Sequence, residues 1–282
     1  MKLFKQAGDL QLHLSKLNLE GKKTGFMPTM GALHNGHISL LNLSKQDCDV
    51  TVCSIFINPT QFNDKKDFDN YPITVGDDIR LLENSLCDVL YLPQANEIYP
   101  DGTDELEHYD LGTLETILEG KYRLGHFQGV CQVVHRLLDI VSPNCLFLGQ
   151  KDYQQCMVVM HLMKLIQNPV RVEIGPTLRE ASGLAMSSRN QRLSQKQKEQ
   201  ATAIYKMLTY IQAANKSLSP EILVNHATDY LLSNGFTKVD YVTIADCDTL
   251  KPATDRWPSK AVALIAAFIG EVRLIDNMII DV

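Results

Sequence analysis

Over its first 176 residues the chain alternates short, continuously apolar segments with longer amphipathic ones, and this alternation restricts the possible folds more than any other feature. Short apolar runs are typical of buried strands, and the 3.6-residue period of the longer segments indicates helices. Continuous apolar strands separated by helices form a parallel sheet that is covered on both faces. The sequence therefore predicts an α/β fold for this part of the chain. The expected strands are residues 24–27, 50–57, 89–92, 145–148 and 170–174, and the expected helices are residues 38–43, 75–85, 129–141 and 152–166.

After residue 176 the pattern changes, which predicts a second domain. Ser194 is expected to cap the first helix of this domain, and Gly235 to end the second. Gly270-Glu271 predicts a tight hairpin between two strands. We therefore divide the chain into an N-terminal domain, residues 1–176, and a smaller α+β C-terminal domain, residues 177–282, with helices and an antiparallel sheet. The expected elements of the second domain are helices at residues 194–215 and 220–234 and strands at residues 238–244, 261–269 and 272–280.

Composition restricts the class of protein. The chain has 282 residues, 45% hydrophobic and 21% charged, which fits a globular protein of one large or two modest domains. A net charge of −6 without a long basic run argues against nucleic acid as the main partner. The longest apolar run near the C-terminus, residues 261–269, is too short to span a bilayer, and the N-terminus lacks an apolar signal core. We expect a cytoplasmic enzyme without a membrane partner.

The seven cysteines predict reduced, structural thiols. Their number is odd, and no two form a Cys-x-x-Cys pair. Most lie in apolar segments, as Cys53 does, where a thiol packs as a small hydrophobic group. The same spacing gives no support to a zinc site.

His34-Asn35-Gly36-His37 is the most informative motif, and it lies between the first strand and the first helix. This order places the histidines at a helix N-terminus, where unpaired N–H groups and a partial positive charge suit a phosphate. Gly36 would let a nucleotide approach the backbone closely, and the two histidines would project to one side. In isolation, two surface histidines near a turn would explain the motif equally well. A His-x-Gly-His after the first strand nevertheless resembles the signature of Rossmann-like nucleotidyl-transferring enzymes, which act on the α-phosphate of ATP, and the sequence has no P-loop.

Two uncharged amides follow the second strand. Pro59 ends that strand, so Asn58 and Gln61 are expected at the edge of the sheet where ligands bind, near the histidines. Uncharged amides there suit a hydroxyl-rich, partly apolar substrate. A polar loop without a ligand is the alternative.

Another helix start, at residues 149–152, follows the strand at residues 145–148. Lys151 could reach phosphate oxygens as a point charge. Asp152 is either the N-cap of the helix or an acceptor for a ribose hydroxyl, and Gln155 shares its face.

Residues 186–189, Met-Ser-Ser-Arg, lie just after the change of pattern. Two hydroxyls and an arginine in a loop could form a mobile phosphate clamp, or else an N-cap and a solvated charge for the next helix. Asp77 and Asp78 open the helix at residues 75–85 and complement its dipole, and Asp77 is also a candidate for a metal ligand. His126 is expected in a loop, with a structural role.

Together these motifs resemble the pantothenate synthetase (pantoate–β-alanine ligase) family, and the resemblance covers essentially the whole chain in order. The motifs that carry it are Pro28-Thr29-Met30-Gly31-Ala32-Leu33-His34-Asn35-Gly36-His37, Ser54-Ile55-Phe56-Ile57-Asn58-Pro59-Thr60-Gln61-Phe62, Gly149-Gln150-Lys151-Asp152 and Met186-Ser187-Ser188-Arg189-Asn190, with Glu97-Ile98-Tyr99-Pro100, Gly125-His126-Phe127 and Arg273-Leu274-Ile275-Asp276-Asn277 in support.

The resemblance implies an ATP-dependent condensation of (R)-pantoate with β-alanine that gives pantothenate, AMP and pyrophosphate, on the path to coenzyme A. In that family the pantoate carboxylate attacks the α-phosphate of ATP, and β-alanine then attacks the enzyme-bound pantoyl adenylate. The family also implies Mg2+ that accompanies ATP, no organic prosthetic group, and a homodimer whose second domain acts as a lid. Charge stabilisation and in-line positioning would matter more than a strong base, because pantoate is already ionised.

The family's site residues carry over by match. His37 is the expected proton donor, and His34, Lys151 and Arg189 join it in supplying positive potential. Asp152 would bind the ribose, and Gln61 would border both pantoate and β-alanine. The expected ATP site comprises Met30, Gly31, Ala32, Leu33, His34, Asn35, Gly36, His37, Gly149, Gln150, Lys151, Asp152, Leu178 beside the adenine, Met186, Ser187, Ser188 and Arg189, and the expected pantoate site comprises Asn58, Gln61 and Gln155.

Two residues depart from the family pattern. Gln150 stands where the family has glutamate, which makes the surroundings of Lys151 less negative, and Leu124 stands where it has proline, which loosens a loop.

Two other functions would each leave part of this pattern unexplained. Another nucleotidyltransferase of the same fold would need basic residues for an acceptor phosphate, where this chain offers amides. A non-catalytic nucleotide- or RNA-binding module would not need the histidines, the amides and the clamp together.

Overall fold

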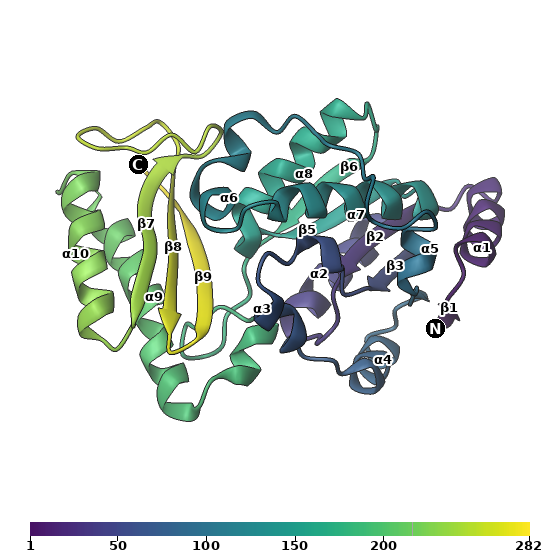
Figure 1. The fold of residues 1–282 in the computed structure, drawn as a ribbon, viewed down its shortest axis with the longest axis horizontal. Helices are drawn as coiled ribbons and strands as arrows, with labels where there is room; N and C mark the ends of the chain where they lie inside the picture. The colour runs from purple at the N-terminus through teal and green to yellow at the C-terminus, as the bar shows by residue number, and fades with distance from the viewer. Residues whose placement is uncertain (216) are drawn as a thin grey trace. The chain divides into compact units, whose positions relative to one another are not determined.

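The computed structural model describes residues 1–215 and 217–282, and the chain divides into two compact units, Met1–Pro176 and Thr177–Val282 (Figure 1). The buried apolar residues of the two units form separate clusters. Among the described residues, no helix combines the length and the apolar character needed to cross a membrane.

The first unit is built on a six-stranded, parallel, Rossmann-like sheet with the strand order β1-β4-β3-β2-β5-β6. The predicted parallel sheet and its five expected strands are confirmed. The edge strand β1 was not predicted, because its three residues are mostly exposed and show no apolar run. The strands are β1 (Lys2–Phe4), β2 (Thr24–Thr29), β3 (Val50–Ile55), β4 (Val89–Tyr91), β5 (Cys145–Gly149) and β6 (Arg171–Gly175).

Helices cover both faces of this sheet, as predicted. Phe26 of β2 belongs to a core formed with α1, α7 and α8, whereas its neighbour Met27 belongs to a core formed with α2 and α4. Helix α1 was not predicted, and its first amide, Ala7 N, donates to Glu97 Oε2 at 2.8 Å, far along the chain. The helices are α1 (Ala7–Leu19), α2 (Asn35–Asp47), α3 (Lys65–Asp69), α4 (Val75–Asn84), α5 (Ala95–Ile98), α6 (Leu118–Tyr122), α7 (His126–Val141) and α8 (Tyr153–Leu165).

The strand order brings three of the predicted motifs to one edge of the sheet. Strand β2 lies between β3 and β5, and the chain leaves their carboxyl ends at Thr29, Ile55 and Gly149. This is the point where the strand order reverses, and such a point is where ligands of open α/β sheets bind. The histidine motif, the amides and Lys151 therefore follow three adjacent strands.

Some boundaries differ from those expected. Strand β2 continues through Pro28, where a turn was expected, because β2 pairs with β5 only at Gly25 and Phe26, and Pro28 lies beyond that ladder. Helix α7 begins at His126, three residues early, so His126 is a helical residue and not a loop residue.

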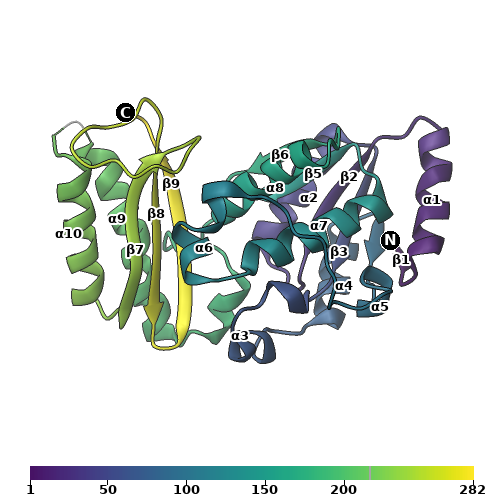
Figure 2. The ribbon, with the colours of Figure 1, turned by 45° about the horizontal axis from the view of Figure 1, so that its top comes forward.

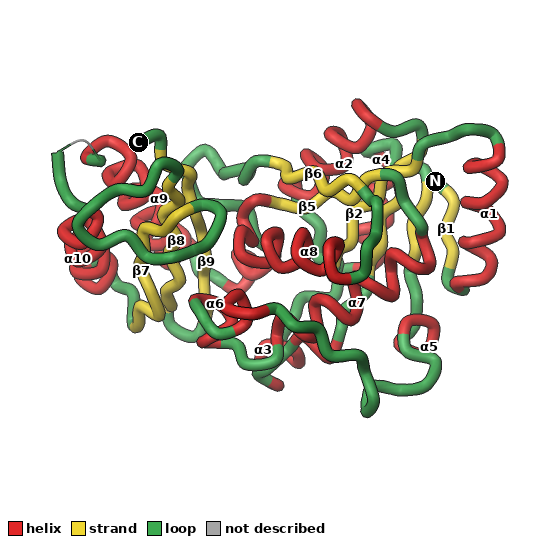
Figure 3. Tube along the Cα trace, turned by 90° about the horizontal axis from the view of Figure 1, so that it is seen from above, coloured by secondary structure: helices red, strands yellow, loops and turns green. Residues whose placement is uncertain are grey.

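The second unit packs two helices on a three-stranded antiparallel sheet, with the order β7-β8-β9 (Figures 2 and 3). Ser194 caps α9 with a reciprocal capping box, and Gly270, with φ 56°, turns the β8–β9 hairpin. The predicted α+β architecture is confirmed. The elements are α9 (Gln195–Ala214), α10 (Pro220–Ser233), β7 (Lys238–Asp246), β8 (Ala261–Ile269) and β9 (Val272–Ile280).

Candidate active site

A buried carboxylate shapes the turn between β2 and α2. Gly31 and Ala32 both have left-handed backbones, with φ 83° and 47°. Asp78 of α4, 2% exposed, accepts hydrogen bonds from Ala32 N at 3.0 Å and Leu33 N at 2.8 Å. Thr74 Oγ1 donates to the same carboxylate at 3.1 Å. Asp78 therefore anchors the histidine turn, residues 29–37. The sequence indicated only that its charge complements the dipole of α4.

The two histidines cap helix α2 reciprocally. His34 Nδ1 accepts from Gly36 N at 3.1 Å, and His37 Nδ1 accepts from His34 N at 3.2 Å. A backbone amide can only donate, so neither Nδ1 carries a proton, and Nε2–H is the donor of each neutral ring. The ring centroids lie 4.1 Å apart, which confirms that the two side chains project together.

Both histidines are neutral at physiological pH. Burial, and then the charge of Lys151, lower the pKa of His34 to about 4. Burial, and then the charges of His34 and Lys151, hold the pKa of His37 well below its usual value. In this structure the histidines therefore offer N–H donors and not the positive potential expected of them. The N-terminus of α2 also differs from the phosphate site that was expected there. The amides of His34 and Gly36 are not unpaired, because they donate to the Nδ1 atoms of the two rings.

Lys151 brings a positive charge to these histidines. It follows β5 within a single 3-10 turn, and its side chain is 17% exposed. Its Nζ lies 3.8 Å from Asp152 Oδ1, and its charge acts on both histidines. Asp152 occupies the N-cap position of α8 without a capping hydrogen bond from its side chain, so its half-exposed carboxylate does not cap the helix. Gln155 lies partly exposed on the first turn of α8.

The amide motif also meets the histidine turn. Gln61 Nε2 donates to Met30 Sδ at 2.7 Å. Asn58 is 1% exposed, and its Nδ2 donates to Gly129 O at 3.0 Å while its Oδ1 accepts from the Tyr99 hydroxyl at 2.8 Å. Asn58 therefore stabilises its own turn from the buried side, whereas the side chain of Gln61 contacts the histidine turn.

Helix α7 packs against the turn that carries Asn58 and Gln61, residues 58–62, which we term the amide turn. His126 is 4% exposed; its Nε2 lies 2.9 Å from Arg123 Nη1 and its Nδ1 2.8 Å from Gln61 O. Because a guanidinium only donates, His126 Nδ1–H donates to Gln61 O. At Gly129 a Cβ would lie 2.4 Å from Thr60 O, so only glycine permits this contact. The structural role of His126 is thus to hold the backbone of Gln61 through this hydrogen bond.

The second unit carries the remaining predicted residues. Met186 N donates to Leu178 O at 3.0 Å, so the proposed adenine and phosphate residues are neighbours. Ser187 caps a short 3-10 helix by accepting from Arg189 N at 3.3 Å, and Ser188 is buried. Residues 186–189 thus include an N-cap, but it caps this short 3-10 helix, whereas the next α-helix, α9, is capped by Ser194.

No preformed metal centre is found within residues 1–215 and 217–282, which contain no cluster of three or more histidine, cysteine, aspartate or glutamate side chains suited to a metal. Asp77, the candidate metal ligand, has a largely exposed side chain that is ion-paired with Arg80. All seven cysteines are free thiols, as predicted. Leu124, the departure from the family pattern, is 77% exposed.

Comparison with known proteins decides the family. The model of the pantoate–β-alanine ligase family matches residues 2–279. The chain belongs to this family. It is 41% identical over 280 residues to the pantothenate synthetase of Azobacteroides pseudotrichonymphae, and 38% identical over 280 residues to that of Porphyromonas gingivalis, with 99% of both chains covered in each case.

Solved structures of the family agree with this fold. The crystal structure of pantothenate synthetase from Thermus thermophilus matches with a TM-score of 0.92 and 34% identity, over 99% of each chain. The pantoate–β-alanine ligase of Francisella tularensis, solved with β-γ ATP and β-alanine, matches with a TM-score of 0.84 and 37% identity, over 99% of this chain and 97% of the other. The activity of the chain is therefore that of a pantoate–β-alanine ligase in pantothenate biosynthesis.

Proposed function

We propose that this ligase activates (R)-pantoate as an acyl adenylate at the histidine turn. A carboxylate oxygen of pantoate forms a bond to the α-phosphorus of ATP, and the bond from that phosphorus to pyrophosphate breaks. The amine of β-alanine then bonds to the acyl carbon, AMP leaves with the former carboxylate oxygen, and the amine loses a proton. The observation that carries the proposal is the pair of neutral Nε2–H donors beside Lys151 at the switch point of the sheet.

The histidine turn and Lys151 are proposed to act on the phosphates in different ways, the first by hydrogen bonds and the second by charge. His37 Nε2–H and His34 Nε2–H donate to phosphoryl oxygens, and Lys151 supplies the permanent charge. The backbone of Met30, Gly31, Ala32, Leu33, Asn35 and Gly36 shapes the ATP site, with Gly149 and Gln150 beside it. Bound ATP would raise the pKa of both histidines, because the phosphates are negative. His37 then becomes able to protonate the departing pyrophosphate, as expected from the family.

Gln61 and Gln155 are proposed to bind the hydroxyl groups of pantoate, and Gln61 also to border β-alanine. The contact of Gln61 with Met30 supports this placement, since it puts the amide against the histidine turn. Asn58 was assigned to the same site. Its buried hydrogen bonds to Gly129 and Tyr99 favour a role behind Gln61 instead of direct contact with pantoate.

Mg2+ is proposed to arrive with ATP and to neutralise phosphate charge when bound. Mg2+ usually takes one or two carboxylates together with substrate phosphates and water, and the residues fit that arrangement. Asp78 is committed to the backbone of the histidine turn, so of the two aspartates in the first turn of α4 it is Asp77 that would hold the ion.

The second unit is proposed to close as a lid over the reactive adenylate, with Met186, Ser187, Ser188 and Arg189 as the phosphate clamp and Leu178 beside the adenine. Asp152, a residue of the first unit, is proposed to bind the ribose. A closed lid excludes water from an acyl phosphate. By analogy with the family the ligase acts as a cytoplasmic homodimer, without nucleic acid, membrane or organic prosthetic group.

Isotope exchange tests the adenylate route. With ATP, Mg2+ and pantoate but no β-alanine, the enzyme should exchange labelled pyrophosphate into ATP and should release at most about one pyrophosphate per active site before stalling. Oxygen label from the pantoate carboxylate should appear in AMP once β-alanine is added. Stoichiometric ADP and phosphate, with no exchange, would show a γ-phosphoryl route and overturn the proposal.

A further inference from the structure

The clamp residues belong to a short hairpin in the second unit, residues 177–189, which we term the clamp hairpin. Its arms pair between Arg179 and Ala185, and Met186 N donates to Leu178 O at 3.0 Å. At the tip, Gly183 has φ 90°, and a Cβ there would lie 2.1 Å from Cδ1 of Tyr205. The tip therefore packs directly against an aromatic ring of α9, where a larger residue would not fit.

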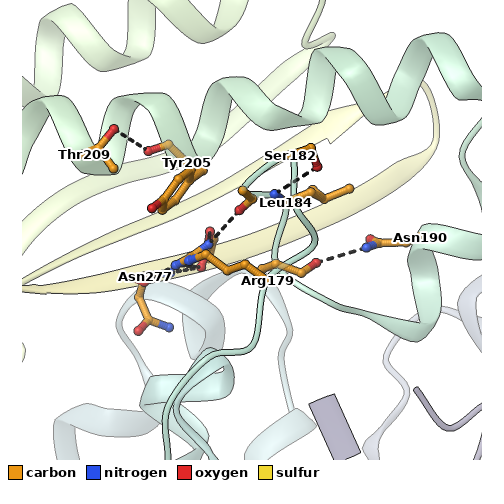
Figure 4. A network of polar contacts seen from close by, with 10 residues as sticks. Arg179, Ser182, Leu184, Asn190, Tyr205, Thr209 and Asn277 are labelled. Carbon is orange, nitrogen blue, oxygen red and sulfur yellow. Dashed lines mark hydrogen bonds and ion pairs between the residues drawn. The ribbon is translucent and has the colours of Figure 1, made fainter. Parts of the chain in front are cut away.

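One guanidinium fastens this hairpin to strand β9 (Figure 4). Arg179 donates to both carboxylate oxygens of Asp276, at 2.5 and 3.1 Å. The same group donates to Asn277 O at 3.3 Å and to Gly183 O at 3.2 Å, at the hairpin tip. It also lies 4.5 Å from the centroid of the Tyr205 ring. Arg179 thus joins the first arm, the tip, the strand and α9 at one point.

The surroundings make this contact strong. The side chain of Arg179 is 18% exposed and that of Asp276 is 4% exposed, so water screens the pair weakly. Asp276 also accepts from the amide of Asn277 at 2.8 Å. Just after the hairpin, Asn190 Nδ2 donates to Ala185 O of the second arm at 3.0 Å and to Glu180 Oε1 of the first arm at 3.3 Å. Asn190 therefore links the two arms, and Arg179 ties the hairpin to β9 by a buried charged group.

We infer that Arg179 is a positioning residue for the ligation, which holds Leu178 and the residues Ser187, Ser188 and Arg189 in the geometry that the nucleotide requires. The inference rests on the proposed clamp function. A planar fork can serve a carboxylate and two carbonyls at once, whereas a lysine is a point charge that cannot. Small displacements of groups that position substrate reduce rates strongly. The motif at residues 273–277 thereby gains a role, since it supplies Asp276 and the Asn277 carbonyl.

The chain offers a matched control on the same strand. Arg273 of β9 donates from Nε to Asp240 Oδ2 at 2.8 Å, and the two side chains are 17% and 2% exposed. This pair resembles the Arg179–Asp276 pair in chemistry and burial, but Asp240 lies on β7 and not in the hairpin. Arg179→Lys and Arg273→Lys therefore make the same chemical change, with and without loss of the hairpin anchor.

The test measures pantoate-dependent pyrophosphate exchange and the ratio of AMP to pantothenate formed with β-alanine present, beside thermal unfolding. Arg179→Lys should lower the exchange rate by about tenfold or more and raise the AMP-to-pantothenate ratio, because a misplaced clamp admits water to the adenylate. Arg273→Lys should leave both within about twofold of the parent. Arg179→Lys with parental exchange and ratio, or equal losses in both variants, would overturn the inference.

Arg189→Ala separates this inference from the clamp itself. A loss of exchange in Arg189→Ala together with a loss in Arg179→Lys supports both. A loss in Arg189→Ala without any effect of Arg179→Lys retains the clamp and removes the positioning role. Parental exchange in Arg189→Ala removes the clamp, and the positioning role with it. If Arg179→Lys unfolds early, the double variant Arg179→Met with Asp276→Leu, which removes both charges of the pair, should still show the raised AMP ratio. A parental ratio in that variant would contradict the inference.

Discussion

The histidine turn of the first unit and the clamp hairpin of the second are both anchored by a buried aspartate from a distant part of the chain, but the two aspartates hold different atoms. Asp78 accepts directly from the backbone amides of Ala32 and Leu33. Asp276 accepts from a side chain, the guanidinium of Arg179. A backbone amide has no rotamers to order, so the first anchor fixes its turn more directly than the second fixes its hairpin.

The two regions also differ in charge. The histidines have lowered pKa values and present neutral N–H donors, whereas the clamp hairpin carries two arginines, Arg179 and Arg189, which are always protonated. The fixed turn thus uses neutral donors of set geometry, and permanent charge is placed on the other unit and on Lys151. The following variants test that division.

The largest effect is expected at His37. Replacing it with alanine removes a preorganised donor and should lower turnover by about 10²–10³ or more. His37→Gln should retain more activity than His37→Asn, because a glutamine amide can place its N–H near the position of Nε2. Steady-state turnover of the three variants, with circular dichroism to confirm folding, measures this. Equal activity in the glutamine and asparagine variants would contradict donation from Nε2.

A smaller loss is expected at Asp78. Asp78→Ala leaves the amides of Ala32 and Leu33 without their acceptor, and an unpaired buried donor costs about 1–3 kcal/mol. Both the free energy of unfolding and turnover should fall, the latter by about tenfold or more as the histidines lose their position. Glu83→Gln, an exposed change on the same helix, is the control. Normal turnover in a folded Asp78→Ala variant would show that the turn does not depend on this anchor.

Gln61 should affect pantoate more than nucleotide. Gln61→Ala should raise the KM for pantoate by an amount that reflects one hydrogen bond, roughly 0.5–1.5 kcal/mol. ATP affinity measured without pantoate should stay within a few-fold, and calorimetric titration with each ligand separates the two. An equal loss of ATP affinity would place Gln61 in the nucleotide site.

The smallest effect concerns stability and pH at His34. Its pKa is about 4 in the folded protein and near 6.5 in an unfolded chain. Between these values the unfolded state binds more protons, so stability should fall as the pH falls from 6.5 towards 4. His34→Asn keeps a side-chain cap and should flatten this dependence in urea unfolding measured across the interval. An unchanged slope would show that His34 titrates normally.

The sequence was sufficient to predict that the candidate site residues gather at one edge of the sheet, because they follow adjacent strands. His34, Gln61 and Lys151 come after β2, β3 and β5, and parallel strands deliver such residues to one edge. The reciprocal histidine cap was within reach of sequence reasoning too, since it joins residues three apart.

The contacts that anchor the histidine turn and the clamp hairpin could not be predicted from the sequence, because they join residues far apart in the chain. Asp78 lies 46 residues from Ala32, and Asp276 lies 97 residues from Arg179. No local pattern marks such a pair. The charge state of the histidines was also missed, because it depends on burial and on the approach of Lys151, which only the folded chain fixes.

Nitrogen-15 NMR of the histidine rings tests most directly whether the histidine turn works through neutral Nε2–H donors. In the ligand-free enzyme near pH 6.5, the rings of His34 and His37 should show a protonated Nε2 and an unprotonated Nδ1, and His34 should become protonated only as the pH approaches about 4. Addition of ATP should shift its protonation to higher pH, because the phosphates favour the charged ring. A proton on Nδ1, or two cationic rings near neutral pH without nucleotide, would contradict the account.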